Sequence, residues 1–254
     1  MILNSIDTGT GECFVLLHGL FGAAKNLGVI ARALAGRGRV ISLDMRNHGE
    51  SPHGADMRYE TMAGDVVETM AALGVGEATI IGHSMGGKVG MTLALTRPEL
   101  VARLAVLDIA PVAYSHGHDA FVRAMKAVPL EPGLLRSRAD ELLAAYVPEA
   151  AYRAFLLNNL LLGDGPRWRL GLDEIHGAMA DLTGWEEPSG VRPYEGKAIF
   201  IRGENSDYVR QSAASAIARL FPTAGLFTIA GAGHWLHAEK PEAVVAALLG
   251  SLDE

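Results

Sequence analysis

The chain has 254 residues, 22 basic and 29 acidic side chains and a formal net charge of −7. This length fits one large domain or two small ones, and the negative charge argues against nucleic acid, a partner held mainly through its phosphates. Hydrophobic residues make up 49% and charged residues 20%, close to the averages for globular domains, so disordered and fibrous architectures are excluded. A single cysteine, Cys13, excludes a disulfide scaffold and a cysteine-based zinc site and fits a reducing compartment.

The N-terminal segment Met1–Asp7 lacks the basic region and the long apolar stretch of a secretory signal, which favours a cytoplasmic protein. One stretch without charged residues lies between Arg219 and Glu239. Glycines, a proline and two histidines interrupt it, so it is typical of a strand and a turn, and no insertion into a membrane is expected.

Short apolar runs alternate with longer segments of helical periodicity. Runs too short for helices predict buried strands at Cys13–Leu17, Val40–Leu43, Ala78–Ile81, Leu104–Leu107, Ala198–Ile201 and Leu226–Ile229. Apolar residues spaced three and four apart predict helices at Leu27–Ala35, Tyr59–Leu73, Lys88–Thr96, Val209–Leu220 and Pro241–Leu252. This alternation predicts an α/β fold with a mostly parallel central sheet and helices on both faces.

The alternation stops between Pro111 and Glu187, where apolar residues fall at helical spacings and no convincing strand appears. Four prolines divide this segment into several short helices, and Gly163-Asp164-Gly165-Pro166 predicts a turn. Because the segment lies between two core strands, we expect residues 112–185 to form an inserted helical cap over the carboxyl edge of the sheet. Residues 1–111 and 186–254 then form the core.

The most informative motif is Gly82-His83-Ser84-Met85-Gly86, which matches G-x-S-x-G between a predicted strand and a predicted helix. A serine on such a tight turn needs small neighbours, and the following helix directs backbone N–H groups toward its oxygen. The motif therefore predicts Ser84 as a nucleophile. A glycine-rich turn with an ordinary serine is the alternative.

A general base is expected after the last predicted strand, where Gly231-Ala232-Gly233-His234 lies 150 residues beyond Ser84. A serine hydroxyl is a poor nucleophile near neutral pH, so an imidazole must accept its proton and later deliver it to the leaving group. His234 fits this role.

A third motif, His18-Gly19-Leu20-Phe21-Gly22, follows the first predicted core strand. Its backbone amides are candidates for an oxyanion hole together with the amide of Met85. Leu20 is the favoured donor, and Phe21 stays an alternative.

These motifs occur in order with suitable spacing, and over nearly its whole length the chain resembles the α/β-hydrolase superfamily. The segments Asp44–Pro52, Gly82–Lys88 and Gly203–Ser206 resemble the YbfF-like esterase branch of that superfamily. The resemblance implies an α/β-hydrolase fold and hydrolysis of carboxylic esters or thioesters, with no metal and no organic cofactor.

The acidic partner of His234 has two candidates. Most proteins of the resembled superfamily carry it three residues beyond a glycine after the penultimate core strand, and counting from Gly203 this position holds Ser206, with Asp207 one residue late. The other candidate, Asp108, follows the strand predicted next after that of Ser84. The resembled branch has its acid at this earlier strand, so Asp108 is favoured and Asp207 stays the alternative. Either carboxylate would orient the imidazole and stabilise its protonated form.

Other polar residues receive structural interpretations. His48 and Ser51 are expected to brace a loop beside the site, Arg46 to do so through backbone carbonyls, and His83 to pack or donate a hydrogen bond. Cys13 is expected to be a small core residue. Four histidines lack the spacing of known metal motifs, and no metal site is predicted at His48, His53, His116 and His118.

Together these features predict a serine hydrolase with a Ser-His-Asp triad that forms an acyl-enzyme from a small-molecule ester or thioester. The leucine and phenylalanine side chains of the insert favour a carboxylic acyl group over a peptide, and the alternative is that they only pack the cap on the core. We expect acyl groups of small to medium size. The alternatives are a non-catalytic ligand-binding protein of the same fold, a C–C hydrolase, a perhydrolase and an acyltransferase. The sequence leaves the acyl group, the leaving group and the oligomeric state open.

Overall fold

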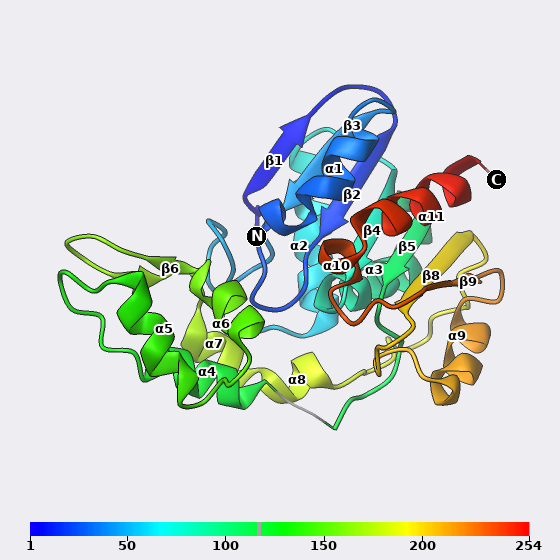
Figure 1. Ribbon diagram of the computed structural model, residues 1–254. Coiled ribbons are helices and arrows are strands. Elements are labelled where there is room, and N and C mark those ends of the chain that lie inside the picture. The colour runs from blue at the N-terminus through cyan, green and yellow to red at the C-terminus, as the bar shows by residue number, and fades with distance from the viewer. Residues whose placement is uncertain (116–117, 254) are drawn as a thin grey trace.

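The computed structural model describes residues 1–115 and 118–253, and a seven-stranded sheet lies at its centre (Figure 1). The strand order is β1-β3-β2-β4-β5-β8-β9, and neighbours pair in parallel except for β1 with β3. All six predicted strands are present. The strands are β1 (Ser5–Thr8), β2 (Cys13–Leu17), β3 (Arg39–Leu43), β4 (Ala78–His83), β5 (Val101–Leu107), β8 (Lys197–Gly203) and β9 (Gly225–Ile229).

Strand β1 was not expected from the sequence. It holds a single large apolar side chain, Ile6, which is about half exposed, and it lies at the edge of the sheet antiparallel to β3. An exposed edge strand has little apolar patterning, because packing does not select its side chains.

Helices cover both faces of the sheet. On one face, α1 (Gly28–Leu34) and α11 (Pro241–Asp253) enclose one hydrophobic cluster. On the other face, α2 (Tyr59–Ala72), α3 (Met85–Thr96) and α9 (Ala214–Leu220) pack on a second, larger cluster. The predicted fold class is therefore confirmed.

Two helix boundaries differ from the sequence prediction. The helix after Ser84 begins at Met85 rather than Lys88. The segment predicted as one helix from Val209 consists of a 3₁₀ turn at Gln211–Ala213 followed by α9. Three further short elements complete the core. They are 3₁₀ turns at Ala24–Leu27 and Pro98–Leu100 and the helix α10 (Leu236–Glu239).

Between β5 and β8 the chain forms short helices, drawn in green to yellow in Figure 1, as the prolines predict. These helices are α4 (Asp119–Lys126), α5 (Arg136–Ala144), α6 (Ala150–Leu157), α7 (Leu172–Gly177) and α8 (Met179–Thr183). The expectation that no strand occurs here was wrong, since β6 (Leu160–Leu161) and β7 (Arg167–Trp168) pair as a small hairpin around the predicted turn. Strands of two residues carry too little pattern to detect. The division into core and cap stays a prediction.

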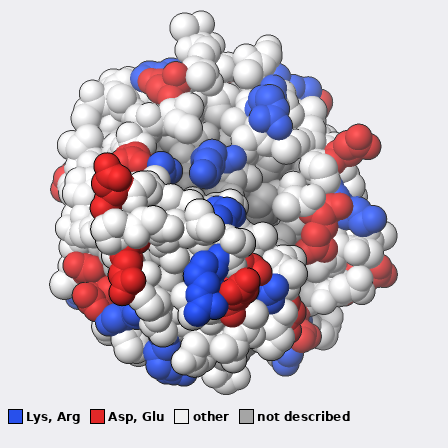
Figure 2. Space-filling model, turned by 60° about the vertical axis from the view of Figure 1, so that its left-hand side comes forward, with Lys and Arg blue, Asp and Glu red and all other residues white. Residues whose placement is uncertain are grey.

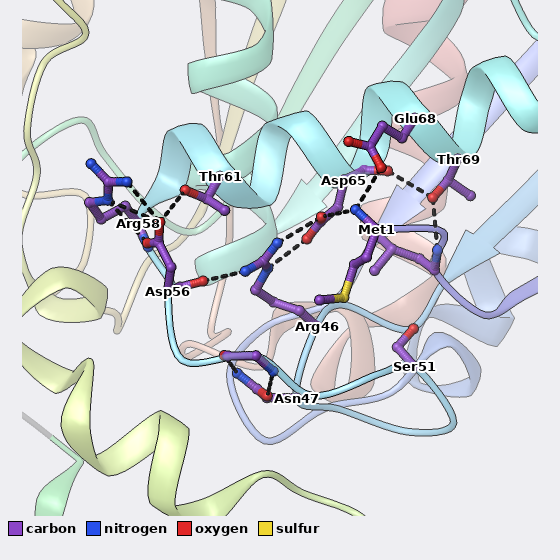
Figure 3. A network of polar contacts seen from close by, with 12 residues as sticks. Met1, Arg46, Asn47, Ser51, Asp56, Arg58, Thr61, Asp65, Glu68 and Thr69 are labelled. Atoms are coloured by element: carbon purple, nitrogen blue, oxygen red, sulfur yellow. Dashed lines mark hydrogen bonds and ion pairs between the residues drawn. The ribbon is translucent and has the colours of Figure 1, made fainter.

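A buried ion pair fixes the loop between β3 and α2 (Figure 3). The guanidinium of Arg46 donates from Nε and Nη2 to the two carboxylate oxygens of Asp65, at 2.6 and 2.7 Å. Arg46 also donates to the carbonyl oxygen of Asp56. Arg46 was expected to brace the loop through backbone carbonyls, and it does contact one, but its main partner is the carboxylate of Asp65. Ser51 accepts a hydrogen bond from the amide of Asn4 at 2.8 Å, which ties the N-terminal segment to this loop.

Basic and acidic side chains are interspersed on the face seen in Figure 2, and several basic ones lie beside a hollow near its centre. Within residues 1–115 and 118–253, no helix combines the length and the apolar character needed to cross a bilayer.

Candidate active site

Ser84 lies on the turn between β4 and α3 with a φ of +51°, in the left-handed region that few residues other than glycine adopt. The turn is very tight. A Cβ atom on Gly82 would lie 2.2 Å from the carbonyl oxygen of Gly86, and one on Gly86 would lie 2.2 Å from that of Leu17. Glycine is therefore required on both sides of the serine, and a strained backbone of this kind is typical of a functional site.

A chain of hydrogen bonds connects Ser84 with two distant residues. His234, in the turn after β9, has its Nε2 atom 3.0 Å from Ser84 Oγ. Its Nδ1 atom lies 2.7 Å from Oδ2 of Asp108, which directly follows β5. The three side chains predicted from separate parts of the sequence thus meet at the carboxyl edge of the sheet, after the parallel strands β4, β5 and β9.

Asp108 is fully buried, and its φ of +52° is also left-handed. Its Oδ1 accepts the amide of Gly203 at 2.9 Å, and its Oδ2 accepts the hydroxyl of Ser206 as well as the imidazole of His234. Asp207, the alternative acid, is 75% exposed and pairs with Arg210 at 3.2 Å. The structure therefore brings Asp108, and not Asp207, to His234.

The loop after β2 lies against the serine. A Cβ atom on Gly19 would lie 3.2 Å from Cβ of Ser84, so the backbone of this loop passes very close to the nucleophile. The amide of Phe21 donates to Nε2 of His48 at 3.0 Å and is therefore engaged. Leu20 lines the cavities at Ser84. Of the two amides considered from the sequence, that of Leu20 remains the candidate.

His83, next to the nucleophile, is buried and its Nε2 lies 2.9 Å from the carbonyl oxygen of His234, to which it donates. Burial, followed by the neighbouring rings of His237 and His234, holds the pKa of His83 well below its usual value. His83 is thus a neutral donor that contacts the backbone of His234, in agreement with its expected role.

Sequence reasoning missed the aromatic partner of His234. The ring of Tyr208 stacks on the imidazole with centroids 3.8 Å apart and an interplanar angle of 16°. Tyr208 lies in the short loop after β8 that also contains Ser206. The hydroxyl of Ser206 and the backbone amide of Gly203, at the end of β8, both donate hydrogen bonds to Asp108. The loop after β8 thus contacts Asp108 and His234 without supplying the carboxylate, and nothing in the sequence pointed to Tyr208 in particular.

A cavity opens at Ser84 and His234. Phe121, Tyr152 and Phe155 line it from α4 and α6, and Trp235 lines it from the loop beside His234. The rings of Tyr152 and Phe155 lie 4.5 and 5.1 Å from that of Trp235. The helical insert therefore supplies much of the apolar wall around the serine.

The histidines considered for metal binding have other surroundings. His48 is engaged by backbone groups, and His118 packs 5.5 Å from the ring of Phe121. His116 lies outside the described residues. Among the residues that the structure describes, no group of three or more histidine, cysteine, aspartate and glutamate side chains is arranged to hold a metal ion. Cys13 is buried at the start of β2.

Comparison with known proteins gives a consistent result. A family model described as alpha/beta hydrolase fold matches residues 12–241. The sn-1-specific diacylglycerol lipase ABHD11 of Mus musculus is 42% identical over 249 residues, which cover 94% of this chain and 80% of that protein. Esterase YbfF of Escherichia coli (strain K12) is 39% identical over 241 residues, covering 94% of this chain and 92% of that protein.

A solved structure described as "Marine microorganism esterase" superposes with a TM-score of 0.94 at 35% identity and covers 98% of each chain. Matches of this extent confirm the resemblance inferred from the motifs. The chain belongs to the α/β-hydrolase fold family and is a YbfF-like member of it.

Proposed function

We propose that this protein hydrolyses carboxylic esters or thioesters of small to medium acyl groups through an acyl-enzyme on Ser84. The observation that carries the proposal is the hydrogen-bonded chain from Ser84 Oγ through His234 to Asp108, at 3.0 and 2.7 Å. The printed names of the relatives, an esterase and a lipase, support cleavage of an ester bond.

In the first half of the reaction, Oγ of Ser84 attacks the acyl carbonyl carbon while Nε2 of His234 accepts the hydroxyl proton. The backbone amides of Leu20 and Met85 stabilise the oxyanion that forms, at the positive end of α3. Asp108 keeps His234 in the tautomer that has its proton on Nδ1 and stabilises the imidazolium. His234 then donates its proton to the departing alcohol or thiol, which leaves the acyl group on Ser84.

In the second half, His234 accepts a proton from water, and the resulting hydroxide attacks the acyl-enzyme at the same carbonyl carbon. The tetrahedral intermediate collapses, the carboxylic acid leaves, and the proton returns to Ser84 Oγ. Apart from the water molecule, the nucleophile, the base, the carboxylate and the oxyanion donors of this cycle are all residues of the chain.

Labelling with a fluorophosphonate probe tests the nucleophile. The wild-type protein should be labelled stoichiometrically, and Ser84→Ala should not be labelled and should lose at least about 10³-fold in kcat on 4-nitrophenyl butyrate. Ser206→Ala is the matched control for labelling, because its hydroxyl also lies in the site but does not contact the base, and it should still be labelled. Labelling that persists in Ser84→Ala would refute the assignment.

A series of 4-nitrophenyl esters and acyl-coenzyme A thioesters of increasing chain length then defines the acyl group. Activity that falls from short to long chains would support small to medium acyl groups. Tight binding of these compounds without turnover would instead favour a non-catalytic binding protein.

A further inference from the structure

The charged side chain of Lys88 is buried inside the protein, with only 1% exposed. It lies on α3 one helical turn after the nucleophile, and its amide donates to the carbonyl oxygen of Ser84 at 3.1 Å. Lys88 takes no part in the proposed reaction. A cation at this depth is costly unless it has partners, so its surroundings need an explanation.

The partners of Lys88 are all uncharged. Its Nζ donates to the carbonyl oxygens of Thr183 and Gly184, and it lies 5.3 Å from the ring centre of Tyr59 and 4.8 Å from that of Tyr114. Within the described part of the chain no carboxylate offsets the charge: burial alone lowers the pKa of Lys88, to about 7. Of three ammonium donors, two meet carbonyl oxygens. The group thus lacks a counter-ion.

Lys88 also lines a cavity that reaches Ser84. This second, small cavity is lined by both Ser84 and Lys88, together with Tyr59, Tyr114 and Leu182. Leu20 and Met85, whose amides are the candidate oxyanion donors, line it too. The hydroxyl of Tyr59 is already engaged, since it donates to the carbonyl oxygen of Leu182 at 2.6 Å. Among the described residues that line this cavity, Lys88 is the one lysine or arginine, and the imidazole of His118 is the other basic group.

We propose that this cavity binds a carboxylate group carried by the ester substrate, with Lys88 Nζ as the cation that recognises it. The inference rests on the proposed ester hydrolysis and specifies its substrate class: short esters with an anionic end. A carboxylate would supply both the missing counter-charge and an acceptor for an ammonium donor, and such charge-assisted bonds strengthen in a water-poor site. Because Ser84 and Lys88 line the same small cavity, a substrate that reaches both residues must have a short chain between its ester carbonyl and its carboxylate.

Matched pairs of esters test the proposal. Monomethyl succinate and methyl pentanoate carry acyl groups of similar size with and without a charge, and acetoxyacetate and propyl acetate do the same for the alcohol portion. Proton release in a pH-stat gives kcat and KM for each. We expect at least one anionic ester to have a kcat/KM about tenfold or more above that of its neutral partner, mainly through KM, and the pair that shows it identifies which portion enters the cavity.

Substitution of the lysine isolates its contribution. In Lys88→Met the anionic-to-neutral ratio of kcat/KM should fall about tenfold or more, whereas Lys126→Met, on the surface of α4, should keep the wild-type ratio. If the anionic esters show no advantage in the wild-type protein, or if Lys88→Met lowers both members of a pair equally, Lys88 only fastens the segment at Thr183 and Gly184, and the proposal is wrong.

Calorimetric titration of succinate and of the neutral succinamide into the wild-type protein requires neither turnover nor a folded variant. Succinate should bind at least tenfold more tightly, and equal affinities would overturn the proposal. Absence of turnover on all four esters, combined with selective binding of succinate, would refute the hydrolase function while leaving the anion site in place.

Discussion

Two buried histidines act as hydrogen-bond acceptors for the loops that flank the site. Nε2 of His18 accepts the amide of Met45 at 2.9 Å, and Nε2 of His48 accepts that of Phe21 at 3.0 Å. Each ring donates from Nδ1 to a nearby carbonyl oxygen. Burial lowers the pKa of both imidazoles, that of His48 to about 3. A proton on Nε2 would remove the acceptor, so both rings must stay neutral for the loops to keep this arrangement.

The stability of the fold should therefore fall as the pH is lowered from about 6.5 toward 3. In this interval the unfolded chain protonates His48, whose ordinary pKa is near 6.5, while the folded protein does not, so the unfolded state gains stability. Between pH 7 and pH 5 this imidazole alone accounts for about 2 kcal/mol.

Urea unfolding of the wild-type protein, His48→Asn and His53→Asn at these two pH values measures the effect. Between pH 7 and pH 5, the unfolding free energy of His48→Asn should decrease by about 2 kcal/mol less than that of the wild-type protein. His53 is exposed on the same loop, so His53→Asn should show the wild-type decrease. An unchanged pH dependence in His48→Asn would contradict the interpretation.

Replacement of Asp108 should lower kcat far more than replacement of Asp207, the alternative acid in the loop after β8. Asp108→Asn should reduce kcat by about 10³-fold or more, because the imidazole loses both its orientation and the charge that stabilises its protonated form. Asp207→Asn should change kcat less than about twofold, since this side chain is exposed and pairs with Arg210. Steady-state kinetics on 4-nitrophenyl butyrate decide the matter, and the reverse ranking would identify Asp207 as the acid.

Among the helices, the first turn of α3 tolerates no side chain at Gly86, whereas the middle of α2 tolerates one at Gly64. A Cβ atom on Gly86 would meet the carbonyl oxygens of Leu17 and His18 at 2.2 and 2.7 Å, whereas one on Gly64 would meet no atom within 4 Å. Gly86→Ala should therefore destabilise the protein by about 1–3 kcal/mol and distort the serine.

Gly64→Ala should instead raise the free energy of unfolding by about 0.5–1 kcal/mol, because alanine loses less backbone entropy than glycine when it enters a helix. Thermal unfolding of the two variants beside the wild type gives both values. A Gly64→Ala protein that melts below the wild type would show that α2 depends on this glycine in some other way.

The sequence predicted the elements whose pattern is set by burial. Strands β2 and β4 are buried at every residue, so continuous apolar runs revealed them. Edge strand β1 and the two-residue strands of the hairpin bury few side chains and left no pattern. For the candidate site, Ser84 and His234 followed from local motifs, whereas the contact of Asp108 with His234 spans 126 residues and depends on how the strands are ordered. The stacking of Tyr208 and the uncompensated charge of Lys88 likewise arise only from tertiary packing.

At the scale of the whole molecule, the aromatic wall contributed by α6 should limit the length of the acyl group. Phe155→Ala removes a ring that packs on Trp235 and lines the cavity at Ser84, so the cavity enlarges. The variant should shift the optimum of the 4-nitrophenyl ester series toward longer chains. Tyr146→Ala, a 57% exposed aromatic position in the same segment, should keep the wild-type profile. If both variants keep it, this wall does not select the acyl chain.

The helical insert is also bonded to the loop that passes beside the serine. Nδ2 of Asn159, which follows α6, donates to the carbonyl oxygen of Phe21 at 2.8 Å, and the amide of Gly171, at the start of α7, donates to that of Asn47 at 2.9 Å. The carbonyl of Phe21 lies one residue beyond the Leu20 peptide whose amide is the candidate oxyanion donor. These two hydrogen bonds tie the segment between α6 and α7 to the loops at Phe21 and Asn47, so any displacement of this segment would have to break them or move those loops with it.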